Sequence, residues 1–360
     1  MYLEKIKLMK LLSVKKRKIA ILFTAGLGDT LLFVPLLKEL KRKNFHITCI
    51  FYSKYNNDCL LDSGLVDSKK YITGKVSLVL YALTRARYFC NIYINHLGVG
   101  NLINLSAFIC SKRITKTSGF SKKGTLPKRI KAVNPNFSDA EQNLHLLYTE
   151  ANAVIKNIAD FYLPKPMHSN SHKYTFQINN AIGYFIIQVS AGNNTSPFKN
   201  WPFKNWLILI HRLCKTFTDF EFIIVGDDSE TFYIKDLEDL DCINCTILIG
   251  KTTIEDVFNL TAKSNGYIGL DSGIMHMAVV LQKKTLTIFG ASNEKSYGYG
   301  FLDPENQMVI TTSLNCRPCS NWKNANTSRV TDPMQCPDFA CLTLIEPDYI
   351  FKKICAHFKL

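Results

Sequence analysis

The alternation of buried strands with helices is the feature that most constrains how this chain can fold. An apolar run at 18–26 ends in glycine, a helical pattern of apolar residues follows at 29–44, and another apolar run lies at 46–52. Asp29 stands at the start of the helix, where it can serve as the cap. A strand, a turn, a helix and a further strand make the unit from which parallel sheets are built. The first part of the chain is therefore predicted to form a parallel sheet covered by helices.

The same alternation returns in the second half of the chain. Strands are predicted at 184–192, 221–228, 266–273 and 284–290, with helical patterns between them at 203–217, 229–240, 252–264 and 274–283. Two such halves predict an α/β protein with two Rossmann-like, doubly wound domains that face each other across a cleft. In sheets of this kind, ligands bind where the carboxyl ends of strands lead into helices.

A polar segment with two prolines at 162–173 separates the halves, and 360 residues are enough for two domains. The expected organisation is an N-terminal domain over 1–165, a linker over 166–180, a C-terminal domain over 181–345, and a last helix over 346–360 that can return to the N-terminal domain. Apolar spacing also predicts an amphipathic helix over 1–13 and a helix over 138–158 that begins at a Ser or Asp cap.

Composition and the N-terminal residues bear on where the protein works. Hydrophobic residues make up 47% and charged residues 20% of the chain, and no apolar run approaches the roughly 18 residues that a membrane span needs. Lysines interrupt the apolar residues of the N-terminal segment, which is unlike a secretory signal. We expect a cytoplasmic protein whose twelve cysteines are mostly buried and reduced.

The chain is strongly basic. Forty-four Lys and Arg residues stand against 29 Asp and Glu residues, a formal net charge of +15, and they concentrate at 15–18 and 112–131. These basic runs can simply be solvent-exposed surface. They can also bind an anionic partner, which would be nucleic acid, an anionic membrane surface or a phosphorylated substrate. Zinc-finger, helix-turn-helix and aromatic-interleaved basic motifs are all missing from the sequence, so no nucleic-acid partner is expected.

A polar turn stands at the entrance to the helical pattern at 274–283. Asp271 follows an apolar strand, and the backbone N–H groups that would point together from the helix start belong to Ser272, Gly273, Ile274 and Met275. Unsatisfied donors at the positive end of a helix form an anion site, which a protonated His276 could reinforce. The alternative is that Asp271 is only the helix cap and His276 a satisfied core histidine.

Two further segments carry candidate site residues. Gly26 and Gly28 precede Asp29 in a glycine-rich turn that lacks the third glycine of a dinucleotide site and the lysine of a P-loop. A carboxylate there could accept a proton from a substrate hydroxyl, or it could only cap the helix. Lys199, on the loop after the strand at 184–192, could reach phosphates held at the Asp271 turn, or it could be a surface lysine without a partner.

Taken in order, these segments resemble the heptosyltransferase-like enzymes of glycosyltransferase family 9. The motifs that carry the resemblance are Gly28, Asp29 and Pro35; Gly192, Lys199, Trp201 and Pro202; Gly226; Gly250, Lys251 and Thr252; Asp271, Ser272, Gly273 and His276; and Phe289, Gly290 and Ser292. The match is loose over 45–180 and tight over 184–292. Ala291 departs from the family, where proline is common at this position.

The resemblance implies a GT-B fold and an inverting, metal-independent transfer of sugar from a nucleotide-sugar, with an ADP-heptose-like donor favoured. It implies that Asp29 is the general base in an acceptor-side loop with Gly26 and Gly28. It also implies a donor site made of Lys199, Ser272, Gly273, Ile274 and His276 on the diphosphate, Asp271 on the sugar hydroxyls or the turn, and Glu230 on the ribose. No cofactor is expected.

The acceptor that the resemblance implies is lipopolysaccharide core or another envelope glycan, an acidic or phosphorylated glycolipid. The enzyme would then work peripherally at the inner face of the cytoplasmic membrane, with its basic N-terminal segment on anionic lipid. The alternatives are a GT-B sugar-nucleotide binder or epimerase without transferase activity and, further off, a basic nucleic-acid-binding protein.

Four cysteines near the C-terminus, Cys316, Cys319, Cys336 and Cys341, approach a zinc pattern but end in C-x4-C instead of C-x-x-C. Structural zinc and reduced or disulfide-bonded cysteines are both open interpretations, and the resemblance requires no metal.

Overall fold

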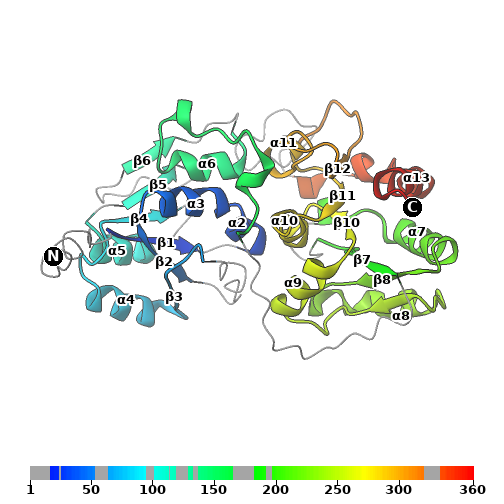
Figure 1. Ribbon diagram of the computed structural model, residues 1–360, viewed down its shortest axis with the longest axis horizontal. Coiled ribbons are helices and arrows are strands. Elements are labelled where there is room, and N and C mark those ends of the chain that lie inside the picture. The colour runs from blue at the N-terminus through cyan, green and yellow to red at the C-terminus, as the bar shows by residue number, and fades with distance from the viewer. Residues whose placement is uncertain are drawn as a thin grey trace, which may run out of the picture. The chain divides into compact units, whose positions relative to one another are not determined.

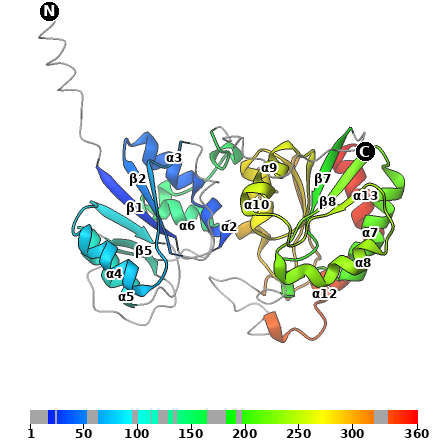
Figure 2. The same cartoon turned by 90° about the horizontal axis from the view of Figure 1, so that it is seen from below.

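The computed structural model describes residues 17–23, 26–52, 64–94, 101–112, 114–118, 129–132, 137–164, 182–191, 197–319 and 333–360. They contain two six-stranded sheets (Figure 1; Figure 2). Every strand pairing within the two sheets is parallel, as the alternation of strands and helices predicted.

The first sheet has the order β3-β2-β1-β4-β5-β6. Its strands are β1 (Lys18–Phe23), β2 (His46–Phe51), β3 (Ser68–Tyr71), β4 (Asn91–Ile94), β5 (Ile114–Ser118) and β6 (Arg129–Ala132). Lys18 lies opposite His46, and Phe23 opposite Phe51. Every residue of β1 after Lys18 is buried, because helices cover both faces of a doubly wound sheet.

Helices α3 (Val34–Arg42), α4 (Lys75–Thr84) and α5 (Asn101–Cys110) accompany this sheet. Helices α4 and α5 lie side by side in both views (Figure 1; Figure 2). Their inner residues, among them Leu78, Ala82 and Ala107, form one core cluster with Ala20 and Leu22 of β1.

The second sheet repeats the same crossover order, β12-β11-β10-β7-β8-β9. Its strands are β7 (Gly183–Ile187), β8 (Phe220–Ile224), β9 (Cys245–Ile247), β10 (Gly266–Leu270), β11 (Lys284–Ile288) and β12 (Gln307–Ile310). Both sheets therefore have the strand order of nucleotide-binding Rossmann domains, and the Rossmann-like prediction is confirmed.

The helical segments after the first sheet are α6 (Asp139–His145), η2 (Glu150–Asn152), η3 (Ile158–Asp160), η4 (Pro197–Lys199), α7 (Phe203–Thr216), η5 (Asp228–Tyr233), α8 (Ile234–Glu238), α9 (Ile254–Lys263), α10 (Gly273–Val280), α11 (Glu294–Tyr297), η6 (Pro333–Gln335), α12 (Ala340–Thr343) and α13 (Pro347–Phe358). Trp201 and Trp206 are buried with their rings edge to face at 5.1 Å, and Trp201 Nε1 donates to Ile345 O. Thr253 caps α9 in a capping box with Asp256.

The predicted helix over 29–44 is interrupted. Two residues separate helix α2 (Leu27–Leu31) from α3, because Pro35 has no N–H to continue the helical hydrogen bonds. At the break, Asn143 Nδ2 donates to Leu32 O at 3.0 Å. The N-cap of α2 is Gly26, so Asp29 lies within the first turn and the expectation that it caps a helix was wrong.

The predicted helix over 138–158 is also shorter than expected. Ser138 caps α6 in a capping box with Glu141. The second carboxylate oxygen of Glu141 accepts from Ile155 N at 3.0 Å, so the chain after α6 folds back onto the helix.

The chain divides into two compact units whose boundaries differ from the expected domains. The first comprises 1–24, 36–54 and 64–132, and the second comprises 25–35, 55–63 and 133–360. Residues 137–164 therefore lie with the second sheet. Leu163 N donates to Val280 O at 2.9 Å, and Phe161 packs edge to face on Tyr299. The expected linker over 166–180 lies outside the described residues, as does the expected helix over 1–13.

Helix α13 packs within the second unit. Ile350, Phe351 and Ile354 on its inner face are buried in the same core cluster as α7, and the Arg212 guanidinium of α7 lies 4.0 Å from the Phe351 ring centroid. This packing differs from the expected return of the last helix to the N-terminal domain. The physical reason is that the apolar stripe of α13 packs against α7 and β11 of the second unit.

Candidate functional site

The turn between β10 and α10 has the geometry of an anion site. Ser272 is the N-cap of α10, with extended backbone angles, and its hydroxyl accepts from Met275 N at 3.5 Å. The amides of Gly273 and Ile274 have no carbonyl one turn behind them in the helix. Ser272, Gly273 and Ile274 are only half-buried, so a ligand can reach them. These amides lie at the positive end of the helix, as expected.

Asp271 does not cap the helix, because Ser272 has that role. Its side chain is buried, and its Oδ2 lies 2.8 Å from Lys199 Nζ in an ion pair. Burial alone would raise the pKa of Asp271, but the positive charge of Lys199, helped by the nearby Ser292 side chain, holds it below its usual range. Lys199 is therefore not a surface lysine without a partner.

The position of Lys199 follows from the packing beneath it. Its neighbour Phe198 is buried against Ala291 and Cys319, and Ala291 N donates to Phe198 O at 3.4 Å. A side chain at Gly290 would place its Cβ 2.8 Å from Phe198 O. Gly290 and Ala291 thus let η4 approach the loop after β11 closely, and the Lys199 ammonium ends 5.9 Å from the Tyr297 ring centroid.

His276 lies one turn into α10 and is buried. Its Nδ1 lies 2.7 Å from the Tyr299 hydroxyl. Burial lowers the pKa of His276 to about 4, and the positive charge of Lys199 adds to the effect, while Asp271 opposes it. At neutral pH this shift favours the neutral imidazole, which can donate only one hydrogen bond. The burial of the ring agrees with the alternative of a core histidine, and contact of His276 with a phosphate stays a prediction.

Two glycines let α2 cross the start of α10 at close range. A Cβ on Gly28 would lie 2.9 Å from His276 Cδ2, and a Cβ on Gly273 would lie 2.9 Å from Leu27 Cβ. Real Cβ atoms do not approach other atoms so closely, so both positions need glycine for this contact. The crossing brings the exposed Asp29 to the amino-terminal end of α10.

The same contact gathers further acidic and phenolic groups that the sequence reasoning missed. Burial raises the pKa of Tyr297 well above its usual value, and the negative charges of Asp139, Asp271 and Asp29 raise it further. Asp139 is close enough to interact with the hydroxyl directly, although Tyr297 Oη makes no well-formed hydrogen bond within the described residues. Asp139 had been considered only as a helix cap. The SYGYG run at 296–300, which begins three residues beyond the F-G-x-S motif, could have drawn attention to Tyr297 and Tyr299.

Glu230 lies in η5, in the turn that follows β8. It is buried and forms a capping box with Asp227, whose N–H donates to Glu230 Oε2 at 3.3 Å. A Cβ on Gly226 would lie 2.2 Å from the same oxygen. The lack of a side chain at Gly226 thus leaves room for the Glu230 carboxylate. The contact of Glu230 with a ribose stays a prediction.

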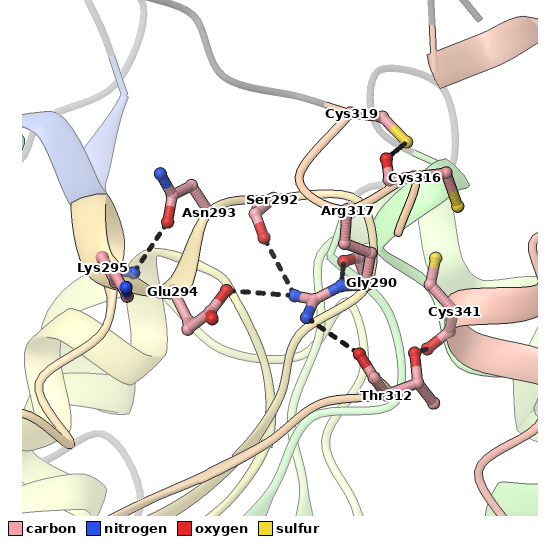
Figure 3. Close-up of polar contacts among 10 residues, drawn as sticks. All are labelled: Gly290, Ser292, Asn293, Glu294, Lys295, Thr312, Cys316, Arg317, Cys319 and Cys341. Atoms are coloured by element: carbon pink, nitrogen blue, oxygen red, sulfur yellow. Dashed lines mark hydrogen bonds and ion pairs between the residues drawn. The ribbon is translucent and has the colours of Figure 1, made fainter. Parts of the chain in front are cut away.

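Arg317 holds the loop that follows β11 (Figure 3). Its guanidinium donates to the backbone carbonyls of Gly290, Thr312 and Ser292, at 2.6, 3.4 and 3.2 Å, and it pairs with Glu294 at 3.2 Å. The same loop carries Ser292, whose side chain helps to lower the pKa of Asp271. Sequence reasoning did not single out Arg317.

Three of the C-terminal cysteines, Cys316, Cys319 and Cys341, lie on one side of this arginine (Figure 3). Cys319 Sγ lies 3.0 Å from Cys316 O, and burial raises the pKa of Cys341 to about 12. Over the described ranges, no group of three or more His, Cys, Asp or Glu side chains is arranged to hold a metal ion. The zinc hypothesis stays a prediction, to be tested by metal analysis of protein purified without a histidine tag.

The sequence of the chain matches the model of a known protein family. The sequence model of glycosyltransferase family 9 (heptosyltransferase) matches residues 101–328, which is more than half of the chain. The comparison with curated protein sequences gives no match.

Solved structures resemble the chain over nearly its whole length. The ADP-heptose lipopolysaccharide heptosyltransferase II of E. coli superimposes with a TM-score of 0.68 at 14% identity, covering 95% of this chain and 98% of that one. A family 9 glycosyl transferase from Veillonella parvula gives 0.68 at 15% identity, covering 95% and 97%. The E. coli heptosyltransferase WaaC with ADP gives 0.62 at 14% identity, covering 94% and 99%. At such identities, the likeness establishes the fold alone.

Proposed function

The chain belongs to glycosyltransferase family 9, the heptosyltransferase family, and from this premise we propose how it acts. It is a glycosyltransferase with the GT-B fold. Its donor is an ADP-heptose-like nucleotide-sugar, and its acceptor is lipopolysaccharide core or another acidic or phosphorylated envelope glycan. Transfer inverts the anomeric carbon and needs no metal ion.

The observation that carries the proposal is the Lys199–Asp271 ion pair beside the start of α10, with Nζ and Oδ2 2.8 Å apart. As the bond from the sugar to the diphosphate breaks, negative charge grows on the departing oxygen. A fixed ammonium and the amides of Gly273 and Ile274 favour that charge without having to reorganise. A cation in this position supplies the stabilisation that a metal ion provides in other transferases.

Asp29 acts on the other reactant. The acceptor hydroxyl attacks the anomeric carbon from the side opposite the diphosphate, so the new C–O bond forms as the old one breaks, and Asp29 takes the hydroxyl proton. The α2–α10 contact through Gly28 supports this role, because it holds the carboxylate near the diphosphate turn. In this proposal His276 is neutral, so it contributes a hydrogen bond and packing to the site, and no charge.

Replacing Asp29 by asparagine tests the proposal. Asp29→Asn keeps the size of the side chain but cannot accept the proton, so turnover should fall by about a hundredfold or more. Binding of the donor, followed by thermal shift with ADP-, GDP-, UDP- and CDP-sugars, should remain. Asp236→Asn, at an exposed acid on α8, is the matched control. Unchanged turnover in Asp29→Asn would remove the catalytic assignment.

Placement at the inner face of the cytoplasmic membrane is part of the proposal. Among the described residues, no helix has the length and apolar character to cross a bilayer. Support for peripheral binding comes from the net charge of +15. Binding of nucleic acid is not expected, and a gel shift at low ionic strength would test this.

A further inference from the structure

One stretch of the sequence, most of it in the first unit, contains basic residues and no acidic ones. Between Asp67 and Asp139 there is no Asp or Glu, while thirteen Lys and Arg residues fall in this interval. Asp67 itself is paired, since its carboxylate lies 2.8 Å from Lys41 Nζ. Helices α4 and α5 belong to this acid-free stretch.

Helix α4 is apolar on two sides. Leu78 and Ala82 face the sheet and are buried, as expected for a helix on a doubly wound sheet. Val76, Leu80 and Leu83 follow one another at helical spacing on the other side, and they are 73%, 58% and 58% exposed. A helix that only covers a sheet needs one apolar face, so the second one is unexplained by the fold.

Helix α5 extends the apolar surface. It packs beside α4 (Figure 2), and its Leu105 and Phe108 are 43% and 37% exposed. We call these five side chains, Val76, Leu80, Leu83, Leu105 and Phe108, the α4–α5 face. Single exposed apolar residues are ordinary, but a group on two neighbouring helices marks an interaction site.

Cations gather where both helices end. Arg85 and Arg87 follow α4, and Lys112 follows α5; all three are exposed. The backbone joins the two ends, because Arg87 N donates to Ile109 O at 2.8 Å. The ring of Tyr88 lies close to both Lys18 and Arg85, whose charged groups are 4.1 and 5.0 Å from its centroid. An amphipathic aromatic ring among cations is typical of side chains at a membrane interface.

We infer that the α4–α5 face docks on a bilayer that contains anionic lipid. The apolar side chains enter the boundary between headgroups and acyl chains, and Arg85, Arg87 and Lys112 bind lipid phosphates. A second copy of this chain would bring the same uncompensated positive charge to the contact and be repelled, whereas an anionic bilayer is complementary. The inference rests on the proposed placement at the membrane and names the surface of the protein that contacts the lipid.

Vesicle flotation of the full-length protein tests the inference. The vesicles are phosphatidylcholine alone or with about one-third phosphatidylglycerol. Arg85→Gln with Arg87→Gln should weaken binding to the anionic vesicles about 25-fold, at roughly fivefold for each lost charge. Leu80→Ser with Leu83→Ser should weaken it at least about tenfold, because less apolar area enters the membrane.

Matched controls come from the second unit. Ile208→Ser with Ile243→Ser changes apolar residues that are 54% and 103% exposed, and Lys235→Gln with Lys263→Gln changes exposed cations. Both should bind vesicles like the unchanged protein, and circular dichroism confirms that all variants fold. If the surface variants bind vesicles like these controls, the inference is overturned. It is also overturned if light scattering shows a dimer that only the leucine variant loses.

Sugar transfer separates this inference from the proposed function. With a water-soluble acceptor fragment, the surface variants should keep full turnover, because none of the changed residues lies at the candidate site. Asp29→Asn should in turn float with anionic vesicles as well as the unchanged protein. Loss of transfer without loss of flotation, or the reverse, shows which of the two proposals has failed.

Discussion

The Lys199–Asp271 pair can be tested by a double-mutant cycle with Lys199→Met, Asp271→Asn and the double variant. With the charged atoms 2.8 Å apart, the gross attraction is about 6 kcal/mol at an effective dielectric constant of about 20. Removing both groups from water offsets part of it, and Lys199 keeps some solvent contact at 18% exposure. We expect a coupling free energy of about 2–3 kcal/mol.

Urea unfolding followed by tryptophan fluorescence measures this coupling, because Trp201 and Trp206 are buried in the same unit. The pH dependence adds a second criterion. The folded pKa of Asp271 is lowered from 3.8, so its stabilisation is fully present above that value and is lost as the pH falls through the folded pKa. Coupling should therefore be constant from about pH 5 to 8. A coupling below about 0.5 kcal/mol, the usual worth of an exposed pair, would refute the idea that Asp271 holds Lys199.

Two further predictions concern the α2–α10 contact. Gly28→Ala should reduce turnover at least about tenfold, because its Cβ would meet His276 Cδ2 at 2.9 Å and push Asp29 away. Gly26→Ala is the control and should leave turnover unchanged, because the space around its Cβ is open. Equal effects of the two variants on turnover would contradict this prediction. His276→Gln should remove a pH dependence of stability: the folded pKa is lowered from 6.5 to about 4, so the neutral imidazole stabilises above pH 6.5 and this contribution is lost as the pH falls toward 4. Urea unfolding between these pH values checks it, and a variant that keeps the wild-type pH dependence would show that another group is responsible.

The parts of the fold that repeat locally could be predicted from the sequence. The strands at β1, β7 and β10 are continuous apolar runs, and the residues after them are glycine and small polar residues, so their buried position and their loops follow from pattern alone. The candidate anion turn at Ser272–Ile274 was predicted in this way, and Ser272 lies at the start of the helix. The helix break at Leu32–Phe33 was missed, although Pro35 could have indicated it.

The parts that depend on packing between distant segments could not be predicted. Asp139 and Tyr297 meet only because residues 137–164 lie against the second sheet, a contact that no local pattern encodes. The charge state of His276 also depends on packing between distant segments. The sequence leaves both a phosphate ligand and a core histidine open, but the approach of Gly28 and Tyr299 buries the ring, and burial decides its pKa.

Helix α2 changes how the site should be understood. It follows the first strand of the first sheet in sequence, yet it belongs to the compact unit of the second sheet. The carboxylate proposed as base and the amides proposed for the diphosphate are therefore parts of one packed unit, joined where Gly28 meets His276 and Gly273 meets Leu27. Packed interiors resist deformation, so the spacing of base and leaving-group site is fixed by these two glycine contacts. A 1 Å displacement of a catalytic group can cost about a hundredfold in rate, which explains why side chains are excluded from both positions.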